Sequence, residues 1–142
     1  MDIERVIDIG ASREKVWTVM TDVARWPEWT ASVTSVEPLG GGPFDVGSRV
    51  RIRQPRLPVA MWTVTILETN RYFEWQAVGP GLKTIGGHRV EAVGRDSARV
   101  TLSLTWNGPL APLMRLLFAT LSRRYVETEA QGLKRRCEAL DV

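Results

Sequence analysis

The single histidine of the chain, His88, is the strongest candidate for acid–base chemistry. It shares its alternating parity with Val90 and Ala92, so a strand would point all three side chains to one apolar face. An imidazole there could act as a general acid or base near neutral pH. A neutral histidine that is hydrogen-bonded to the backbone or to water is the alternative. A bulge at Gly86 or Gly87 would reverse the direction of the side chain.

Two other polar side chains are candidates for contact with a ligand. Tyr125 lies in a helical pattern, where its hydroxyl could orient a carbonyl group or simply reach water from the edge of the helix. Gln54 has inward parity near the end of a strand and could supply one polar contact. Cys137 lies on the apolar side of the same helix as Tyr125, which indicates a buried, unreactive thiol rather than a nucleophile.

The composition excludes several classes of protein. One cysteine cannot form an internal disulfide, and one histidine offers no cluster for zinc, so we expect no metal and no other cofactor. The net charge of +3 is mild and the arginines are interspersed with acids, which argues against a nucleic-acid partner. Arg115 interrupts the longest apolar stretch, so we expect no membrane insertion. The N-terminus lacks the pattern of a secretion signal, and we expect a cytoplasmic protein.

Alternating segments divide the chain into a sheet and its helices. A length of 142 residues suits a single domain, residues 1–142. A first strand is followed by two short helices, one capped by Ser12 and one in VARWPEW (23–29), in which Pro27 limits the length. The pattern predicts about seven antiparallel strands, at 3–9, 33–39, 47–54, 61–68, 72–78, 87–93 and 99–106.

One face of the predicted sheet is apolar and the other is polar. The inward side chains, by parity, are Val50, Ile52, Trp62, Val64, Ile66, Phe73, Trp75, Ala77, His88, Val90, Ala92, Val100, Leu102, Leu104 and Trp106. No carboxylate has inward parity. Arg49, Arg51 and Arg53 form an outward stripe, which we interpret as a solvated face paired to neighbouring acids, with an anionic partner as the alternative.

A long C-terminal helix is predicted over 110–140. Its apolar positions follow a helical period: Leu113, Leu117, Leu121, Tyr125, Leu133, Cys137 and Leu140. At about 1.5 Å per residue, about 28 helical residues in this stretch span about 42 Å, which exceeds the length of a typical strand. The helix must therefore lie across the whole sheet and cover its apolar face.

Five stretches resemble the START-related SRPBCC superfamily, and within it the polyketide cyclase/dehydrase and lipid-transport-like family. They are IDIGASREKVWTVMTDVARWPEW (7–29), VGSRVRI (46–52), NRYFEWQA (70–77), GHRVEAVG (87–94) and WNGPLAPLMRLL (106–117), and together they extend along nearly the whole chain. The resemblance implies the α+β helix-grip fold, in which a curved antiparallel sheet grips the long helix and encloses a cavity. It also implies that the short helices support one end of the sheet, where Trp26 and Trp29 would close the core or the cavity mouth.

A cavity in this position would receive a small hydrophobic ligand. The expected ligand-binding residues are Trp29, Gln54, Trp62, Phe73, Trp75, His88, Trp106, Met114, Phe118 and Tyr125. Packing of the aromatic rings without a cavity remains an alternative. The expected catalytic residues, if there is a reaction, are His88 and Tyr125.

Three functions follow from this interpretation, in order of preference. The first is binding or transport of a small aromatic, polyketide-like or lipid-like molecule. The second is a polyketide cyclase or dehydrase, in which His88 and Tyr125 would supply the base and the hydrogen-bond donor. The third is a protein-interaction module without a ligand, which only the arginine stripe supports. The pattern leaves open whether the protein is a homodimer.

Overall fold

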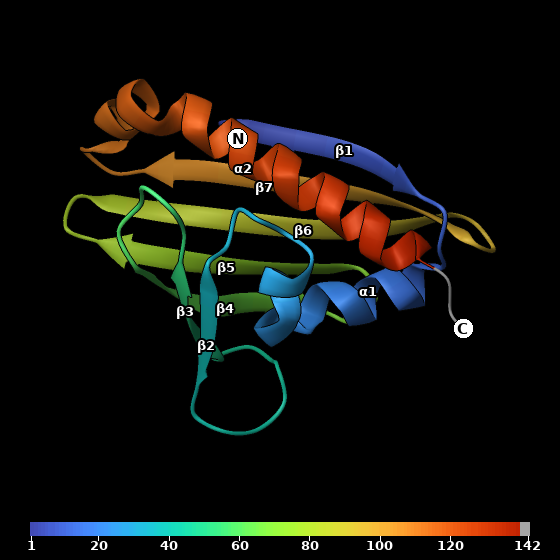
Figure 1. Cartoon of the computed structure of the whole chain (residues 1–142). Helices are drawn as coiled ribbons and strands as arrows, with labels where there is room; N and C mark the ends of the chain where they lie inside the picture. The colour runs from blue at the N-terminus through green and yellow to red at the C-terminus, as the bar shows by residue number, and fades with distance from the viewer. Residues whose placement is uncertain (140–142) are drawn as a thin grey trace.

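A curved antiparallel sheet of seven strands forms the framework of the protein. The computed structural model describes residues 1–139 (Figure 1). The strands lie in the order β1-β7-β6-β5-β4-β3-β2, and each pairs antiparallel with its neighbours. Their bounds are β1 Ile3–Ile9, β2 Ser35–Leu39, β3 Arg49–Arg53, β4 Ala60–Glu68, β5 Tyr72–Gly79, β6 Leu82–Gly94 and β7 Ser97–Asn107.

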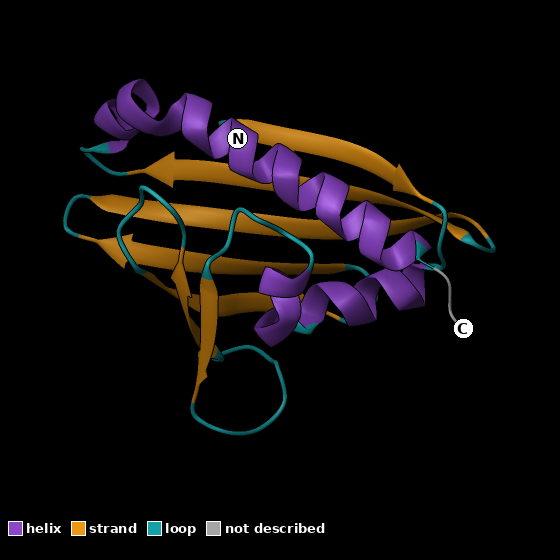
Figure 2. Cartoon of the chain, in the orientation of Figure 1, coloured by secondary structure: helices purple, strands orange, loops and turns teal. Residues whose placement is uncertain are grey.

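Two short helices lie between β1 and β2. The first, α1 (Arg13–Thr21), begins at Ser12, whose Oγ accepts a hydrogen bond from the backbone N–H of Lys15 at 3.2 Å. The second, η1 (Val23–Glu28), is a 3₁₀-helix that contains Pro27. Both lie on the same side of the sheet as the long C-terminal helix, and α1 contacts that helix directly (Figure 2). The predicted order of strands and helices is therefore confirmed.

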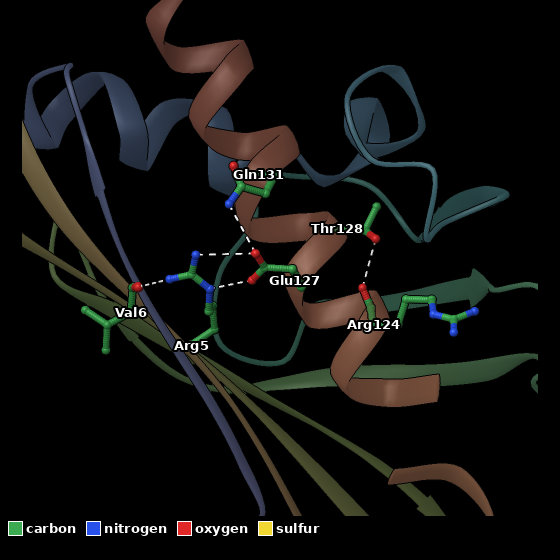
Figure 3. A network of polar contacts seen from close by, with 6 residues as sticks. All are labelled: Arg5, Val6, Arg124, Glu127, Thr128 and Gln131. Atoms are coloured by element: carbon green, nitrogen blue, oxygen red, sulfur yellow. Dashed lines mark hydrogen bonds and ion pairs between the residues drawn. The ribbon is translucent and has the colours of Figure 1, made fainter. Parts of the chain in front are cut away.

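The long helix α2 (Ala111–Glu138) crosses the sheet diagonally and packs on β1 and β7. Figure 3 shows one of its anchors: the guanidinium group of Arg5 in β1 reaches the carboxylate of Glu127, which also accepts a hydrogen bond from Gln131 at 3.1 Å. Lys134 Nζ adds a hydrogen bond to the Asp8 carbonyl at 3.0 Å. These polar contacts hold α2 against the β1 edge of the sheet.

The glycine pair in β6 is a packing feature and not a turn. The register between β6 and β7 is continuous through Gly86 and Gly87, so His88 points inward as its parity predicted. A Cβ atom on Gly86 would lie 2.9 Å from Trp75 Nε1, which explains why this position has no side chain. Because the pair interrupts the alternation of side chains, the predicted strand began at residue 87, whereas β6 begins at Leu82.

Two predictions about inward side chains were wrong. The register of β4 shifts between Val64 and Ile66, so Ile66 turns outward and is 41% exposed. Leu113 and Leu117 are 49% and 60% exposed, because the first half of α2 is apolar on more than one side and presents Met114 to the sheet instead. Leu140, predicted on the same face, lies outside the described residues.

Candidate ligand cavity

A cavity of about 390 Å³ lies between the concave face of the sheet and α2. Its walls come from β3 to β7, from the loop after β3 and from one side of α2. Eight of the ten residues predicted from the sequence line it: Gln54, Trp62, Trp75, His88, Trp106, Met114, Phe118 and Tyr125. Most of the other lining side chains are aliphatic, including Ile52, Leu82 and Leu102. The arrangement is an apolar pocket with a few polar groups, as small-molecule sites commonly are.

The cavity opens at the end where α2 begins. Val59 in the loop after β3 and Val78 at the end of β5 line the cavity and are 44% and 74% exposed. These segments and the start of α2 lie at the same end of the molecule (Figure 1). On the way inward, the Tyr125 hydroxyl donates a hydrogen bond to the Pro55 carbonyl and joins α2 to that loop.

At its inner end the cavity reaches Trp26, His88 and Glu129. Trp26 comes from η1, is 2% exposed, and donates a hydrogen bond from Nε1 to the Met20 carbonyl at 3.0 Å. Its ring lies 5.3 Å from that of Trp75 and 5.8 Å from that of His88. Trp26 therefore closes the inner end of the cavity, and not its mouth.

His88 is enclosed by aromatic rings. Its imidazole stacks on Phe73, with ring centroids 4.0 Å apart and planes 3° from parallel, and meets Trp75 edge-on at 5.4 Å. Burial among these rings lowers the pKa of His88 to about 3, and the backbone of Phe73 opposes this shift only in part. Within residues 1–139, Nδ1 forms no hydrogen bond of normal geometry. His88 is thus a neutral imidazole at physiological pH.

Glu129 was missed by the sequence analysis, which found no inward carboxylate. Its Oε2 atom lies 3.7 Å from His88 Nε2, and its side chain is 16% exposed. Burial raises the pKa of Glu129 to about 8, because no cation in the described chain lies within ion-pair distance of it to stabilise the charged form. The carboxyl group is therefore mostly protonated at neutral pH and can donate a hydrogen bond.

Two of the predicted ligand contacts do not line the cavity. Phe73 has no exposed surface and lies behind the His88 ring, which it supports. Trp29 packs against the other side of α2, where a Cβ atom on Gly132 would lie 2.0 Å from the Trp29 carbonyl oxygen. Both predictions assumed that an inward aromatic ring must reach the cavity, whereas these two rings belong to the core around it.

The other two polar residues that the sequence predicted as ligand contacts have structural partners. The Tyr125 hydroxyl uses its only proton in the bond to Pro55, which leaves none to donate to a ligand. Gln54 Nε2 donates to the Ser32 carbonyl at 3.2 Å and so ties together two loops at the rim. Cys137 is buried, and desolvation raises the pKa of its thiol to about 12, which agrees with the predicted unreactive cysteine.

The regular spacing of the cavity-lining residues on α2 is the pattern that could have identified Glu129 from the sequence. The cavity-lining residues of the helix are Met114, Phe118, Ser122, Tyr125, Val126 and Glu129. They recur every three or four positions, as one side of a helix requires. The apolar residues alone instead indicate the neighbouring row, which contains Leu113 and Leu117.

Within residues 1–139, no three His, Cys, Asp or Glu side chains are grouped so that they could hold a metal ion. None of the helices in this part of the chain is long and apolar enough to cross a membrane.

Solved structures share this architecture over nearly the entire chain. A START superfamily protein from Mycobacterium smegmatis has a TM-score of 0.74 and 17% identity, and the match covers 96% of each chain. Truncated norcoclaurine synthase from Thalictrum flavum has a TM-score of 0.77 and 16% identity, and the match covers 98% of this chain and 94% of that chain. The Zhui aromatase/cyclase from Streptomyces sp. R1128 has a TM-score of 0.72 and 16% identity, and the match covers 96% of this chain and 95% of that chain. The fold is thus the α+β helix-grip fold of the START/SRPBCC superfamily.

A family model identifies the group within this superfamily. The model described as "Polyketide cyclase / dehydrase and lipid transport" matches residues 1–138, so the chain belongs to this family. A comparison with curated proteins finds no match. The description of the family names polyketide cyclases, dehydrases and lipid transport, and so supports ligand binding or a polyketide cyclase role in general.

Proposed function

We propose that this protein binds or transports a small hydrophobic ligand in the cavity between the sheet and α2. The observation that carries the proposal is the cavity itself, whose volume of about 390 Å³ lies within the usual range for small-molecule pockets. Its walls include Trp62, Trp75 and Trp106, whose rings offer flat apolar surfaces to an aromatic or polyketide-like molecule. Lipid-like chains are accommodated by the aliphatic lining between them.

A cavity-filling variant tests this proposal. Ser122 is buried and lines the cavity, so Ser122→Phe places a ring inside it. Thr120 is an exposed residue on the same helix, and Thr120→Phe is the matched control. We expect apolar naphthalene probes to change the tryptophan fluorescence of the wild type and of Thr120→Phe, and to lose at least 10-fold in affinity for Ser122→Phe. Equal affinity for all three proteins would remove the cavity as the binding site.

A cyclase or dehydrase is the second candidate, and the His88–Glu129 pair favours it. Aldol cyclisation needs a base to remove a proton next to a carbonyl group and a donor to stabilise the oxygen that gains charge. The unprotonated imidazole of His88 would supply the first, as a weak base because its pKa is lowered to about 3, and the protonated carboxyl of Glu129 would supply the second, in place of the Tyr125 hydroxyl that the sequence suggested. We expect His88→Ala to abolish cyclisation of a synthetic triketone, followed by absorbance, while binding persists. Undiminished turnover would exclude His88 from a mechanism.

No observation favours the third candidate, an interaction module based on the arginine stripe. Arg51 forms an ion pair with Glu37 at 2.7 Å, and Arg49 contacts the Met61 sulfur atom. These neighbours support the interpretation of the stripe as a solvated face. Such exposed pairs contribute little to stability or recognition.

A further inference from the structure

We propose that the inner end of the cavity is a subsite for an uncharged hydrogen-bond acceptor, above all the carbonyl oxygen of an otherwise apolar ligand, and that Glu129 is the residue that recognises it. The inference rests on the proposed ligand-binding function and adds the chemical class of the ligand. It also states a selectivity: a ligand that ends in a ketone or ester is accepted, and one that ends in a carboxylate is rejected.

The position of Glu129 makes it the end point for a ligand that enters the cavity. Met114 and Phe118 line the cavity near its open end, and Glu129 lines it from the same side of α2. The helix rises about 22 Å between Met114 and Glu129, at about 1.5 Å per residue. Beyond Glu129 the same helix is closely packed, since Ala130 and Leu133 have no exposed surface. A ligand therefore meets Glu129 with the group that leads it into the cavity.

The carboxyl group of Glu129 has unused hydrogen-bonding capacity. Its nearest polar neighbour, His88 Nε2, is 3.7 Å away, which exceeds the usual hydrogen-bond range of about 2.7–3.2 Å. No protein group within residues 1–139 forms a hydrogen bond of normal length with this carboxyl. A polar group removed from water is costly unless it finds a partner. A carbonyl oxygen in the cavity would supply the partner that the described chain does not provide.

The surroundings select for an uncharged partner. The titratable side chains that line the cavity are His88 from β6 and Tyr125 and Glu129 from α2, and the lining residues from β3, β4, β5, β7 and the loop after β3 have none. Burial keeps both Glu129 and His88 uncharged, as the directions of their pKa shifts indicate. A ligand carboxylate would bring a charge to a place without a cation to balance it.

Three naphthalene probes of nearly equal shape separate the alternatives: 2-acetylnaphthalene, 2-ethylnaphthalene and 2-naphthoate. We expect the wild type at pH 6.5 to bind the ketone about 2- to 10-fold more tightly than the ethyl compound, because one buried hydrogen bond is gained. The carboxylate should bind most weakly. Isothermal titration calorimetry or tryptophan fluorescence gives the dissociation constants.

Two substitutions assign the effect to the carboxyl group. Glu129→Met removes the donor and retains the length of the side chain, so the ketone and the ethyl compound should bind equally. Glu129→Gln retains an N–H donor, so the preference for the ketone should persist. In the wild type that preference should fall as the pH rises past 8 and Glu129 ionises, whereas in Glu129→Gln it should not change.

Each outcome bears on one of the two proposals. If none of the probes binds to the wild type, the proposed binding function is wrong and the carbonyl subsite is excluded as well. If the ketone and the ethyl compound bind equally, the cavity binds ligands but the carbonyl subsite does not exist. A preference for the ketone that survives in Glu129→Met, or tightest binding of the carboxylate, would also overturn the inference.

Discussion

The inner side of α2 contains two regions that differ in how they meet the sheet. Toward the C-terminus, Ala130, Leu133 and Cys137 are buried without a gap, and Gly132 allows the backbone of Trp29 to approach closely. From Met114 to Glu129 the helix stands over the cavity instead. The packed region holds the helix in place, so that the other region can leave a space empty.

Two carboxylates of α2 show the same contrast at close range. Glu127 and Glu129 are two positions apart, which places them about 200° from each other around the helix. Glu127 faces β1, where hydrogen bonding to Arg5 lowers its pKa (Figure 3). Glu129 faces the cavity, where burial raises its pKa to about 8. The fold thus gives two identical side chains different charge states, because each one meets different surroundings.

The packed region should give the largest loss of stability when it is truncated. Leu133 has no exposed surface, so Leu133→Ala should lower the free energy of unfolding by about 2–5 kcal/mol. Leu117→Ala is an exposed control of the same residue type on the same helix, and should change it by less than about 0.5 kcal/mol because Leu117 is 60% exposed. Denaturation in urea measures both. Equal effects would show that Leu133 is packed no more closely than an exposed leucine.

A methyl group on Gly132 should be the next largest perturbation. Alanine normally stabilises a helix interior by about 0.5–1 kcal/mol relative to glycine. Here the added Cβ would lie 2.0 Å from the Trp29 carbonyl oxygen, so we expect Gly132→Ala to destabilise the protein by about 1–3 kcal/mol. The same urea denaturation applies. A gain in stability would mean that Trp29 does not pack on this part of α2.

The charge state of Glu129 should make the stability depend on pH. Its folded pKa is raised from 4.5 to about 8, so the folded protein keeps a proton that the unfolded chain loses, and stability falls as the pH rises through this window. Between pH 6.5 and 8 the fall should be about 1.6 kcal/mol, because the slope is close to about 1.4 kcal/mol per pH unit at pH 6.5 and declines to half of this at pH 8. Glu129→Gln should abolish it. Unfolding followed by circular dichroism at both pH values provides the measurement, and identical slopes for the two proteins would contradict the prediction.

His88 contributes little to the change in stability over this pH interval. Burial lowers the folded pKa of His88 from 6.5 to about 3, so stability is lost mainly as the pH falls through the unfolded value of 6.5. Between pH 6.5 and 8 the imidazole is neutral in the folded protein and at most half protonated in the unfolded chain, which changes the stability by only about 0.4 kcal/mol. Because this contribution is also present in Glu129→Gln, the difference in slope between the two proteins reports on Glu129.

Loss of the ion pair between Arg5 and Glu127, on the β1 side of α2, should have the smallest effect on the free energy of unfolding. The folded pKa of Glu127 is lowered, so the contribution of Glu127 to stability is present above the unfolded pKa of 4.5 and is lost as the pH falls. Both partners are partly exposed, and we expect Glu127→Gln to reduce stability by only a few tenths of a kcal/mol at pH 7. A loss greater than about 1 kcal/mol in urea denaturation would show that this contact contributes more than an exposed pair.

The inward side chains of the sheet were predicted more accurately than those of α2, because the period of a strand and the period of a helix constrain the direction of a side chain differently. In a strand each residue has one of two directions, so the alternation around His88 and Trp75 sufficed to point both inward. The predicted direction of Ile66 was wrong, because a bulge that the residue pattern does not indicate shifts the register there. In α2 two adjacent rows are apolar near its start, and only contact with the sheet decides between Leu117 and Phe118.

An NMR titration of the glutamate side chains tests the central claim, which is that the cavity holds an uncharged carboxyl group. The signals of Glu127 and Glu129, assigned through the variants Glu127→Gln and Glu129→Gln, would be followed from pH 3 to pH 10 in the wild type. The account predicts that Glu129 titrates near 8 and that Glu127 titrates below 4.5. Titration of both carboxyl groups below 5 would contradict it, since Glu129 would then be ionised at neutral pH and would have no proton to donate to a ligand.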